Sequence, residues 1–335
     1  MALNRAELNL SIWTGTSSNK PTESTFVISK TKVATDPDIN FEIGELVNDY
    51  LSPVFNNDYG STTNGNIDCV FVNAFTRLFD ESDVAFDFNN PVDRTFVAVN
   101  GYGDFTDGGT PELSRNALIT ANHVYVPENT ASKIPIFAEG VGKFIIQPAG
   151  TTTQVTDNGN TNQKIQYISV PANQTSVAIY DTNDSTLLKT ILITNVCEPT
   201  FTPYKISFLN KLGAIQDLFA FKKTTEKFNV SDATYKTNTI DNTTGSYSTY
   251  KGQEQRYNVN AKSSISLNTG FMDEDSNATI EELFLSENVW IRINNQTLPI
   301  IPKTKSLQIK TKLNDRLINH SIDFEFAFNK INNVR

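Results

Sequence analysis

The sequence is poor in the residue types that most often cross-link a chain or carry out chemistry. Its 335 residues include two cysteines, two histidines, two methionines and two tryptophans. Two cysteines cannot build a disulfide scaffold, and Cys69 and Cys197 each lie in an apolar, strand-like run, so we expect two buried thiols. His123 and His320 lie in strand patterns, far from cysteines or carboxylates at metal-ligand spacing. We therefore expect neither histidine to bind a metal or to act as a catalytic base.

Motifs of the common enzyme and nucleotide-binding classes are also missing. The chain has no Gly-x-Ser-x-Gly elbow, no Gly-x-x-x-x-Gly-Lys-Ser/Thr loop and no Gly-x-Gly-x-x-Gly in a strand–helix context. The acidic run 273–275 suggests a calcium loop, but Ala278 and Phe284 stand where that loop needs glycine and a bidentate glutamate. Capping of a short helix by Ser276 or Asn277 is the favoured interpretation. The sequence thus predicts no enzyme, no cofactor and no metal site.

Long apolar runs and an excess of positive charge are absent as well. No stretch approaches 18 apolar residues, which predicts no membrane span. Residues 1–7 have no apolar core of a secretory signal, so we expect no leader. The formal charge is −9, from 28 basic and 37 acidic residues. Nucleic acid is not expected as the main partner, because binding to phosphates needs clustered lysine and arginine.

Polar, strand-forming residues take the place of what is missing. The chain contains 38 asparagines, 39 threonines, 22 phenylalanines and 11 tyrosines. Threonine and the aromatic residues favour strands and asparagine favours turns, so the composition predicts an all-β fold. Changes along the chain in the spacing of the expected strands and of the polar loops between them predict two or three antiparallel, β-sandwich-like domains with one or two short helices. The expected domains are residues 1–140, a small hairpin or sandwich domain at 141–199, and a C-terminal domain at 200–335.

Several elements can be placed from the hydrophobic pattern. Residues 8–13 alternate apolar and polar side chains, as a half-buried strand does, and residues 41–51 turn from a strand-like to a short helical pattern. Residues 150–164 have almost no apolar side chain and are expected to form an exposed hairpin loop, as are residues 236–250. The better helix is expected at 276–286, held by packing on a sheet.

The C-terminal stretch shows the clearest alternation. Apolar side chains recur at every second position in 307–313 and again in 322–328. We expect these two strands to pair, which would place a row of lysines opposite a row of carboxylates on the wet face: Lys310, Lys312, Asp323 and Glu325. These are candidate assembly charges, because residues 1–120 carry 7 basic and 17 acidic side chains whereas residues 303–335 carry 7 and 3. Chance variation of solvated faces explains the asymmetry equally well.

A glycine-rich turn at 101–109 carries two aromatic residues, Tyr102 and Phe105. Such a turn can expose its side chains, so these two are the candidate glycan contacts, with Trp13 and Tyr125 as further aromatic candidates. Core packing is the commoner fate of aromatic residues. Asp104 and Asp107 in the same turn could hold an ion, but an ordinary turn is the favoured interpretation.

Three stretches carry a resemblance to a known group of proteins. They are residues 204–216 (YKISFLNKLGAIQ), 266–271 (SLNTGF) and 283–291 (LFLSENVWI) leading into 298–300 (LPI). The chain resembles virion structural proteins of tailed bacteriophages, particularly those of marine and Bacteroidetes hosts. The resemblance covers chiefly residues 200–335, with a weaker echo at 41–51.

The resemblance implies a component of a tail, baseplate or neck, made in the bacterial host cytoplasm and found in the virion. It brings no catalytic residues. The implied partners are other copies of the chain and other virion proteins. The alternative is a host-recognition or carbohydrate-binding module that contacts a surface glycan of the host, and a glycan-degrading enzyme is the remaining, least supported hypothesis.

Overall fold

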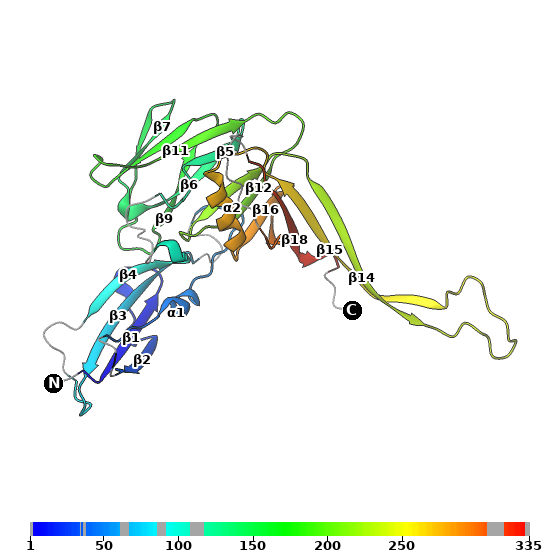
Figure 1. Cartoon of the computed structure of the whole chain (residues 1–335), viewed down its shortest axis with the longest axis horizontal. Coiled ribbons are helices and arrows are strands. Elements are labelled where there is room, and N and C mark those ends of the chain that lie inside the picture. Colours follow the sequence, from blue (N-terminus) through cyan, green and yellow to red (C-terminus); the bar gives the residue numbers. More distant parts are fainter. Residues whose placement is uncertain are drawn as a thin grey trace. The chain divides into compact units, whose positions relative to one another are not determined.

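Strands dominate the computed structural model, which describes residues 3–33, 35, 38–60, 67–85, 92–107, 117–306 and 318–331 (Figure 1). Several antiparallel sheets and two α-helices are present in the described residues, so the predicted all-β, multi-domain fold with short helices is confirmed. No helix within these ranges is both long and apolar enough to cross a membrane.

The chain separates into two compact units, each containing β-structure. Unit 1 comprises Met1–Cys197, Ser207–Leu218 and Asp275–Asn288, and unit 2 comprises Glu198–Ile206, Phe219–Glu274 and Val289–Arg335. One boundary therefore falls close to the predicted boundary at residue 200. A further domain boundary near residue 140 stays a prediction.

A four-stranded antiparallel sheet forms the N-terminal part of unit 1. Its strands lie in the order β2-β1-β3-β4: β1 (Arg5–Trp13), β2 (Phe26–Thr31), β3 (Cys69–Phe79) and β4 (Asp93–Val99). The predicted strand at 8–13 is confirmed as part of β1, and its apolar side chains lie in the core with Val70 and Val72 of β3. The short helix α1 (Gly44–Asn48) adds Val47 to this core. It confirms the helical pattern expected within 41–51.

The central part of unit 1 holds a five-stranded sheet and a two-stranded one. The former has the order β5-β11-β10-β7-β8 and the latter pairs β6 with β9. Their strands are β5 (His123–Pro127), β6 (Ser132–Phe137), β7 (Lys143–Gln147), β8 (Thr151–Gln154), β9 (Ile165–Val170), β10 (Ser176–Tyr180) and β11 (Leu187–Val196). In the five-stranded sheet, β5 runs parallel to β11. Short 3-10 turns lie at η1 (Ser17–Asn19), η2 (Phe105–Asp107) and η3 (Ala138–Gly140).

The loop expected at 150–164 is more ordered than the sequence suggested. Residues 151–154 form β8 against β7. At the end of the segment Lys164 is 1% exposed, and its ammonium lies 2.8 Å from a carboxylate oxygen of Glu139 and 2.8 Å from one of Asp157. A buried lysine needs such partners, since an unpaired buried charge is costly. Most of the segment is exposed, as predicted for a hairpin loop, and the structure departs from the prediction at strand β8 and at the buried Lys164.

The largest sheet has seven strands in the order β13-β12-β16-β17-β18-β15-β14. Five of them belong to unit 2: β14 (Thr225–Lys236), β15 (Glu254–Asn268), β16 (Val289–Ile293), β17 (Gln296–Pro302) and β18 (Ser321–Asn329). The chain passes between the units within β12 (Tyr204–Leu209) and β13 (Ile215–Ala220). Helix α2 (Ser276–Leu285) belongs to unit 1.

The predicted partner of the last strand is wrong. Phe324 of β18 lies opposite Ile265 of β15 on one side and Pro302 of β17 on the other, so both edges of β18 are already paired there. Residues 307–317, including Lys310 and Lys312, lie outside the described residues. The predicted buried face is right for Ile322 and Phe324.

Two smaller expectations also need correction. Helix α2 begins where predicted, but Asp275 occupies the N-cap and makes no capping side-chain hydrogen bond, so capping by Ser276 or Asn277 is wrong. Side chains of the helix such as Ile280 and Leu283 are buried, in keeping with the expectation that packing holds it. Cys69 is buried as expected, whereas Cys197 is exposed.

We predict that Phe324→Ala lowers the free energy of unfolding by about 3–5 kcal/mol, because it empties a fully buried site. Phe328 lies on the same strand and is 55% exposed, so Phe328→Ala should change stability by less than about 1 kcal/mol. Urea denaturation of both variants measures the difference. Equal effects would show that β18 does not bury Phe324.

A second prediction concerns pH. Burial raises the pKa of the Asp68 carboxyl to about 6. Because the unfolded chain releases this proton near pH 4, stability falls as pH rises from about 4 to about 6, and the penalty persists above that range. Asp68→Asn should therefore stabilise the protein at pH 7 by on the order of 2 kcal/mol and much less at pH 4. Urea denaturation at both pH values tests this; a pH-independent difference would contradict it.

Candidate functional site

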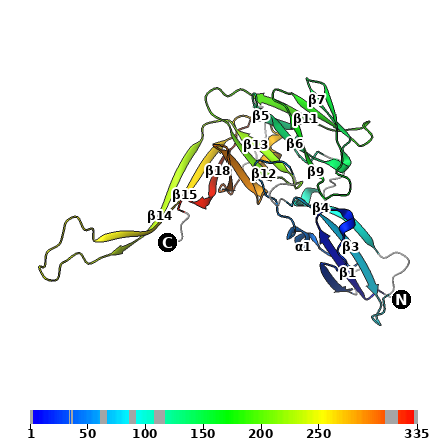
Figure 2. The same cartoon turned by 180° about the vertical axis from the view of Figure 1, so that it is seen from behind.

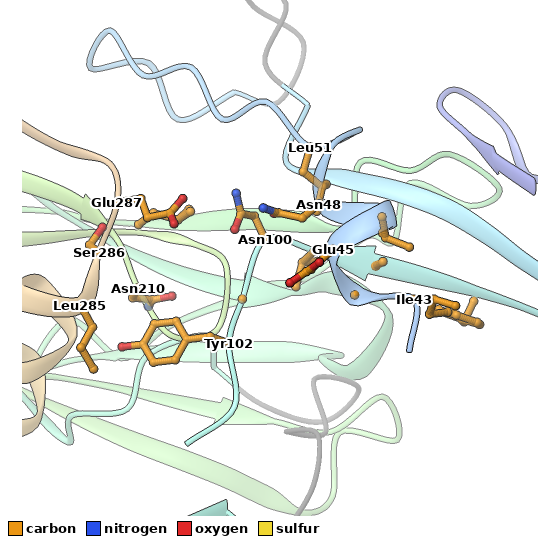
Figure 3. Close-up of a pocket in the computed structure, with 17 residues that line it drawn as sticks. Ile43, Glu45, Asn48, Leu51, Asn100, Tyr102, Asn210, Leu285, Ser286 and Glu287 are labelled. Atoms are coloured by element: carbon orange, nitrogen blue, oxygen red, sulfur yellow. The ribbon is translucent and has the colours of Figure 1, made fainter. Parts of the chain in front are cut away.

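A pocket in unit 1 is the first feature that can carry function. Four segments line it: α1, the strand β4 with the residues that follow it, the end of β12, and the end of α2. It has a volume of about 710 Å³. Figure 3 shows side chains from all four segments around it, among them Asn48, Asn100, Asn210 and Glu287.

Close backbone contact positions one wall of the pocket. The backbone N–H of Tyr102 donates to the carbonyl oxygen of Lys211 at 2.9 Å. A Cβ atom on Gly101 would lie 2.7 Å from that same oxygen, and one on Gly213, which has a φ of +79°, would lie 2.9 Å from Val99 Cγ2. Glycine at 101 and 213 is therefore what lets the 99–102 segment approach the 210–214 turn.

Asn210 holds that turn and is fully engaged in doing so. Its side-chain oxygen accepts hydrogen bonds from the backbone N–H groups of Leu212 (3.1 Å) and Ala214 (3.0 Å). Its amide nitrogen donates to the Leu118 carbonyl (2.7 Å) and to Gln216 Oε1 (3.0 Å). All four hydrogen bonds of the amide are made. Asn210 therefore shapes the pocket and has no group left for a ligand.

Tyr102 offers the pocket its ring rather than its hydroxyl. The hydroxyl oxygen is buried and has no hydrogen-bond partner in the described part of the chain. Burial raises the pKa of Tyr102 to about 12, helped by the nearby carboxylates of Glu282, Glu281 and Asp104. The phenol is therefore neutral at physiological pH.

The mouth of the pocket combines polar side chains with the exposed apolar side chains of Leu285 and Phe96, and its charged groups are all negative. Glu45 and Asn48 lie on α1 and Glu287 follows α2, all exposed, while Asn100 is half-buried. Among the described residues that line the pocket, none is basic. The floor is apolar, with the buried side chains Val47, Leu51 and Leu209 and the half-buried Ala98. Such a pocket disfavours anions and suits a neutral ligand that has both apolar and hydrogen-bonding groups.

The structure separates the predicted aromatic candidates. Tyr102 lines the pocket, but Phe105 does not and is 95% exposed in η2. Trp13 is buried and stacks on Phe71 at 5.5 Å, and Tyr125 is buried and stacks on His123 at 4.5 Å. These side chains form no common platform.

In the glycine-rich turn, the Asp107 carboxylate already has partners within the chain. The Asp107 carboxylate accepts the backbone N–H of Asp104 at 2.7 Å and lies 2.7 Å from the Lys211 ammonium. Over the ranges that the structure describes, no three histidine, cysteine or carboxylate side chains gather in a way that could hold a metal ion.

Sequence reasoning missed the polar residues at the mouth. Asn48, Asn100 and Glu287 come from three distant segments, and each sits in a short stretch without a motif. Only the folded chain brings them together at one pocket.

A projecting β-ribbon in unit 2 is the second candidate feature. The first residues of β15, from Glu254 to Asn260, pair only with β14 among the described strands. Figures 1 and 2 show the two strands leaving the sheet as a ribbon. We call residues 230–259 the arm. Almost all of its residues are exposed, and its large exposed apolar side chains are Val230, Tyr235, Ile240, Tyr247, Tyr250 and Tyr257. The predicted loop at 236–250 forms its tip.

Contacts within the arm are few and local. Tyr235 and Tyr257 meet edge to face with ring centroids 5.6 Å apart. Arg256 Nε lies 2.8 Å from an oxygen of Asp232. A bulge interrupts the ladder between Ser231 and Ala233. The arm carries three basic and three acidic residues, so it has no net charge.

We predict that Gly101→Ala destabilises unit 1 by about 1–3 kcal/mol, since the new methyl group meets a backbone carbonyl that cannot move freely. Gly44 at the start of α1 has open space around it, and alanine favours helix by up to about 1 kcal/mol, so Gly44→Ala should be neutral or stabilising. Thermal and urea unfolding of the two variants compares them directly. Equal stability would refute the close approach of residues 101 and 211.

Comparison with known proteins gives no match. No protein-family model, no curated protein and no solved structure is similar to this chain. The resemblance to phage virion proteins therefore stays a prediction, and function has to be argued from the residues of the chain itself.

Proposed function

We propose that the chain is a structural subunit of a tailed-bacteriophage particle, in its tail or baseplate, and that it acts through contacts between subunits. The arm is the observation that carries this proposal. It presents six large apolar side chains to solvent on a ribbon with no core of its own.

The energetics of the arm favour a bound state. A two-stranded hairpin is at best marginally stable in water, because it buries too little apolar surface to offset the entropy of ordering its backbone. Tyr247 and Tyr250 at the tip are 68% and 84% exposed. Tyrosine is enriched in protein interfaces, where its ring is buried and its hydroxyl finds a partner. Packing against a neighbouring subunit would satisfy both requirements.

One of the candidate assembly charges, Glu325, is already paired within its own chain. Lys262 lies 2.9 Å and Lys303 3.3 Å from carboxylate oxygens of Glu325, and Lys262 is the main cause that holds the pKa of Glu325 below its usual value. Glu325 thus has partners within its own chain. An assembly role for Lys310, Lys312 and Asp323 stays a prediction.

The resemblance of residues 200–335 to phage virion proteins supports the same proposal, because the arm lies inside this region. The expected partners are other copies of the chain and other virion proteins, after synthesis in the bacterial host cytoplasm. The exposed apolar surface of the arm is too dispersed for a small-molecule site and suits a broad protein contact.

The proposal predicts that the purified chain self-associates through the arm. Light scattering coupled to gel filtration should show dimers or larger species that increase with concentration. Replacing Tyr235, Tyr247, Tyr250 and Tyr257 together by serine should give a monomer with an unchanged circular dichroism spectrum.

The matched control changes four exposed apolar residues of unit 1 to threonine: Val27, Val84, Leu187 and Leu192. It should associate like the wild type. A wild-type chain that stays monomeric at the highest attainable concentration, or an arm variant that associates undiminished, would contradict the proposal. Antibodies against the chain should also label intact particles, and a chain found in infected cells but missing from purified particles would overturn the virion assignment.

A further inference from the structure

We propose that the pocket of unit 1 binds an uncharged carbohydrate. This goes beyond the assembly role of the arm and does not depend on it. The pocket belongs to unit 1, whereas the arm belongs to unit 2.

The size and lining of the pocket suit a sugar. Its volume of about 710 Å³ falls in the range of ligand pockets, which is roughly 300–1,000 Å³. The apolar floor at Val47, Leu51 and Leu209 can cover the C–H face of a pyranose ring, and the Tyr102 ring forms part of the wall. Sugars present such apolar faces together with a periphery of hydroxyl groups.

The hydrogen-bonding groups at the mouth are free to serve a ligand. Within the described part of the chain, no hydrogen bond occupies the side-chain amides of Asn48 or Asn100. Each amide can donate and accept, as a sugar hydroxyl can. Ser286 is less available, since its hydroxyl already donates to the Asn288 carbonyl at 3.0 Å.

Charge decides which class of sugar fits. Glu45 and Glu287 place two carboxylates at the mouth, and no basic residue among the described lining residues balances them. An acidic sugar would bring its own carboxylate next to them, and like charges repel. Neutral hexoses and N-acetylhexosamines avoid this cost, and the two carboxylates can accept hydrogen bonds from their hydroxyl groups.

The test is a binding titration of the full-length chain with methyl glycosides of glucose, galactose, mannose, N-acetylglucosamine and glucuronic acid. Saturation-transfer NMR identifies the glycosides that bind, and isothermal titration measures affinity up to about 10 mM, the weak end expected for a ligand that makes only a few hydrogen bonds. At least one neutral glycoside should bind. Asn48→Ala and Asn100→Ala should each weaken that binding by about fivefold, the effect of one lost hydrogen bond.

Three controls make the result specific. Asn183→Ala removes an exposed amide in the turn between β10 and β11 and should leave affinity unchanged. Tyr180→Phe removes a tyrosine hydroxyl at the end of β10, which does not line the pocket, and should also leave affinity unchanged. The glucuronide should bind at least about fivefold more weakly than the glucoside, and the double change Glu45→Gln and Glu287→Gln should remove that gap.

If none of the neutral glycosides binds, the proposal is overturned. Neutral binding that both asparagine variants leave intact, or a glucuronide that binds the wild type as tightly as the glucoside, would also overturn it. Circular dichroism confirms that each variant is folded. None of these outcomes bears on self-association, so the two proposals fail or stand separately.

Discussion

The contact between the 99–102 segment and the 210–214 turn is the constraint on which the centre of unit 1 depends. It rests on two glycines that permit backbone to approach backbone, and on Asn210, which satisfies the polar groups that this approach buries. From Asn210 the hydrogen bonds continue to Gln216 and from there to Thr279 on α2 at 3.3 Å. Two buried amides, those of Asn210 and Gln216, thus tie a turn, a strand and a helix, and Asn210 also lines the pocket.

The two candidate surfaces use opposite physical strategies. The pocket has polar groups at its mouth and an apolar floor, and its walls are held by buried hydrogen bonds that are costly to break. The arm exposes apolar side chains to water, and its contacts are mainly those between its own two strands. A rigid recess suits recognition of a small, defined ligand, whereas a ribbon with adaptable side chains suits a broad contact with another protein.

How far the sequence predicts this structure depends on the range of the interactions involved. Period-two patterns at 8–13 and 322–324 identify buried faces correctly, because the alternation of side chains is a local property of a strand. Strand pairing is not a local property. The same pattern predicted residues 307–313 as the partner of β18, whereas the neighbours of β18 are β15 and β17. The pocket was harder still. Tyr102 stood out because glycines surround it, but nothing near Asn48 or Glu287 in the sequence reveals that they share its surroundings.

The bulge in β14 has a consequence for how the arm makes contact. β14 is the edge strand of its sheet, and a free edge with regular backbone spacing invites further strands to add without limit. At Ser231–Ala233 that spacing is broken, and Asp232 there is held by Arg256. Addition of a further strand by backbone pairing is therefore disfavoured at this point, which leaves the exposed tyrosine side chains as the surface that the proposed assembly contact would use.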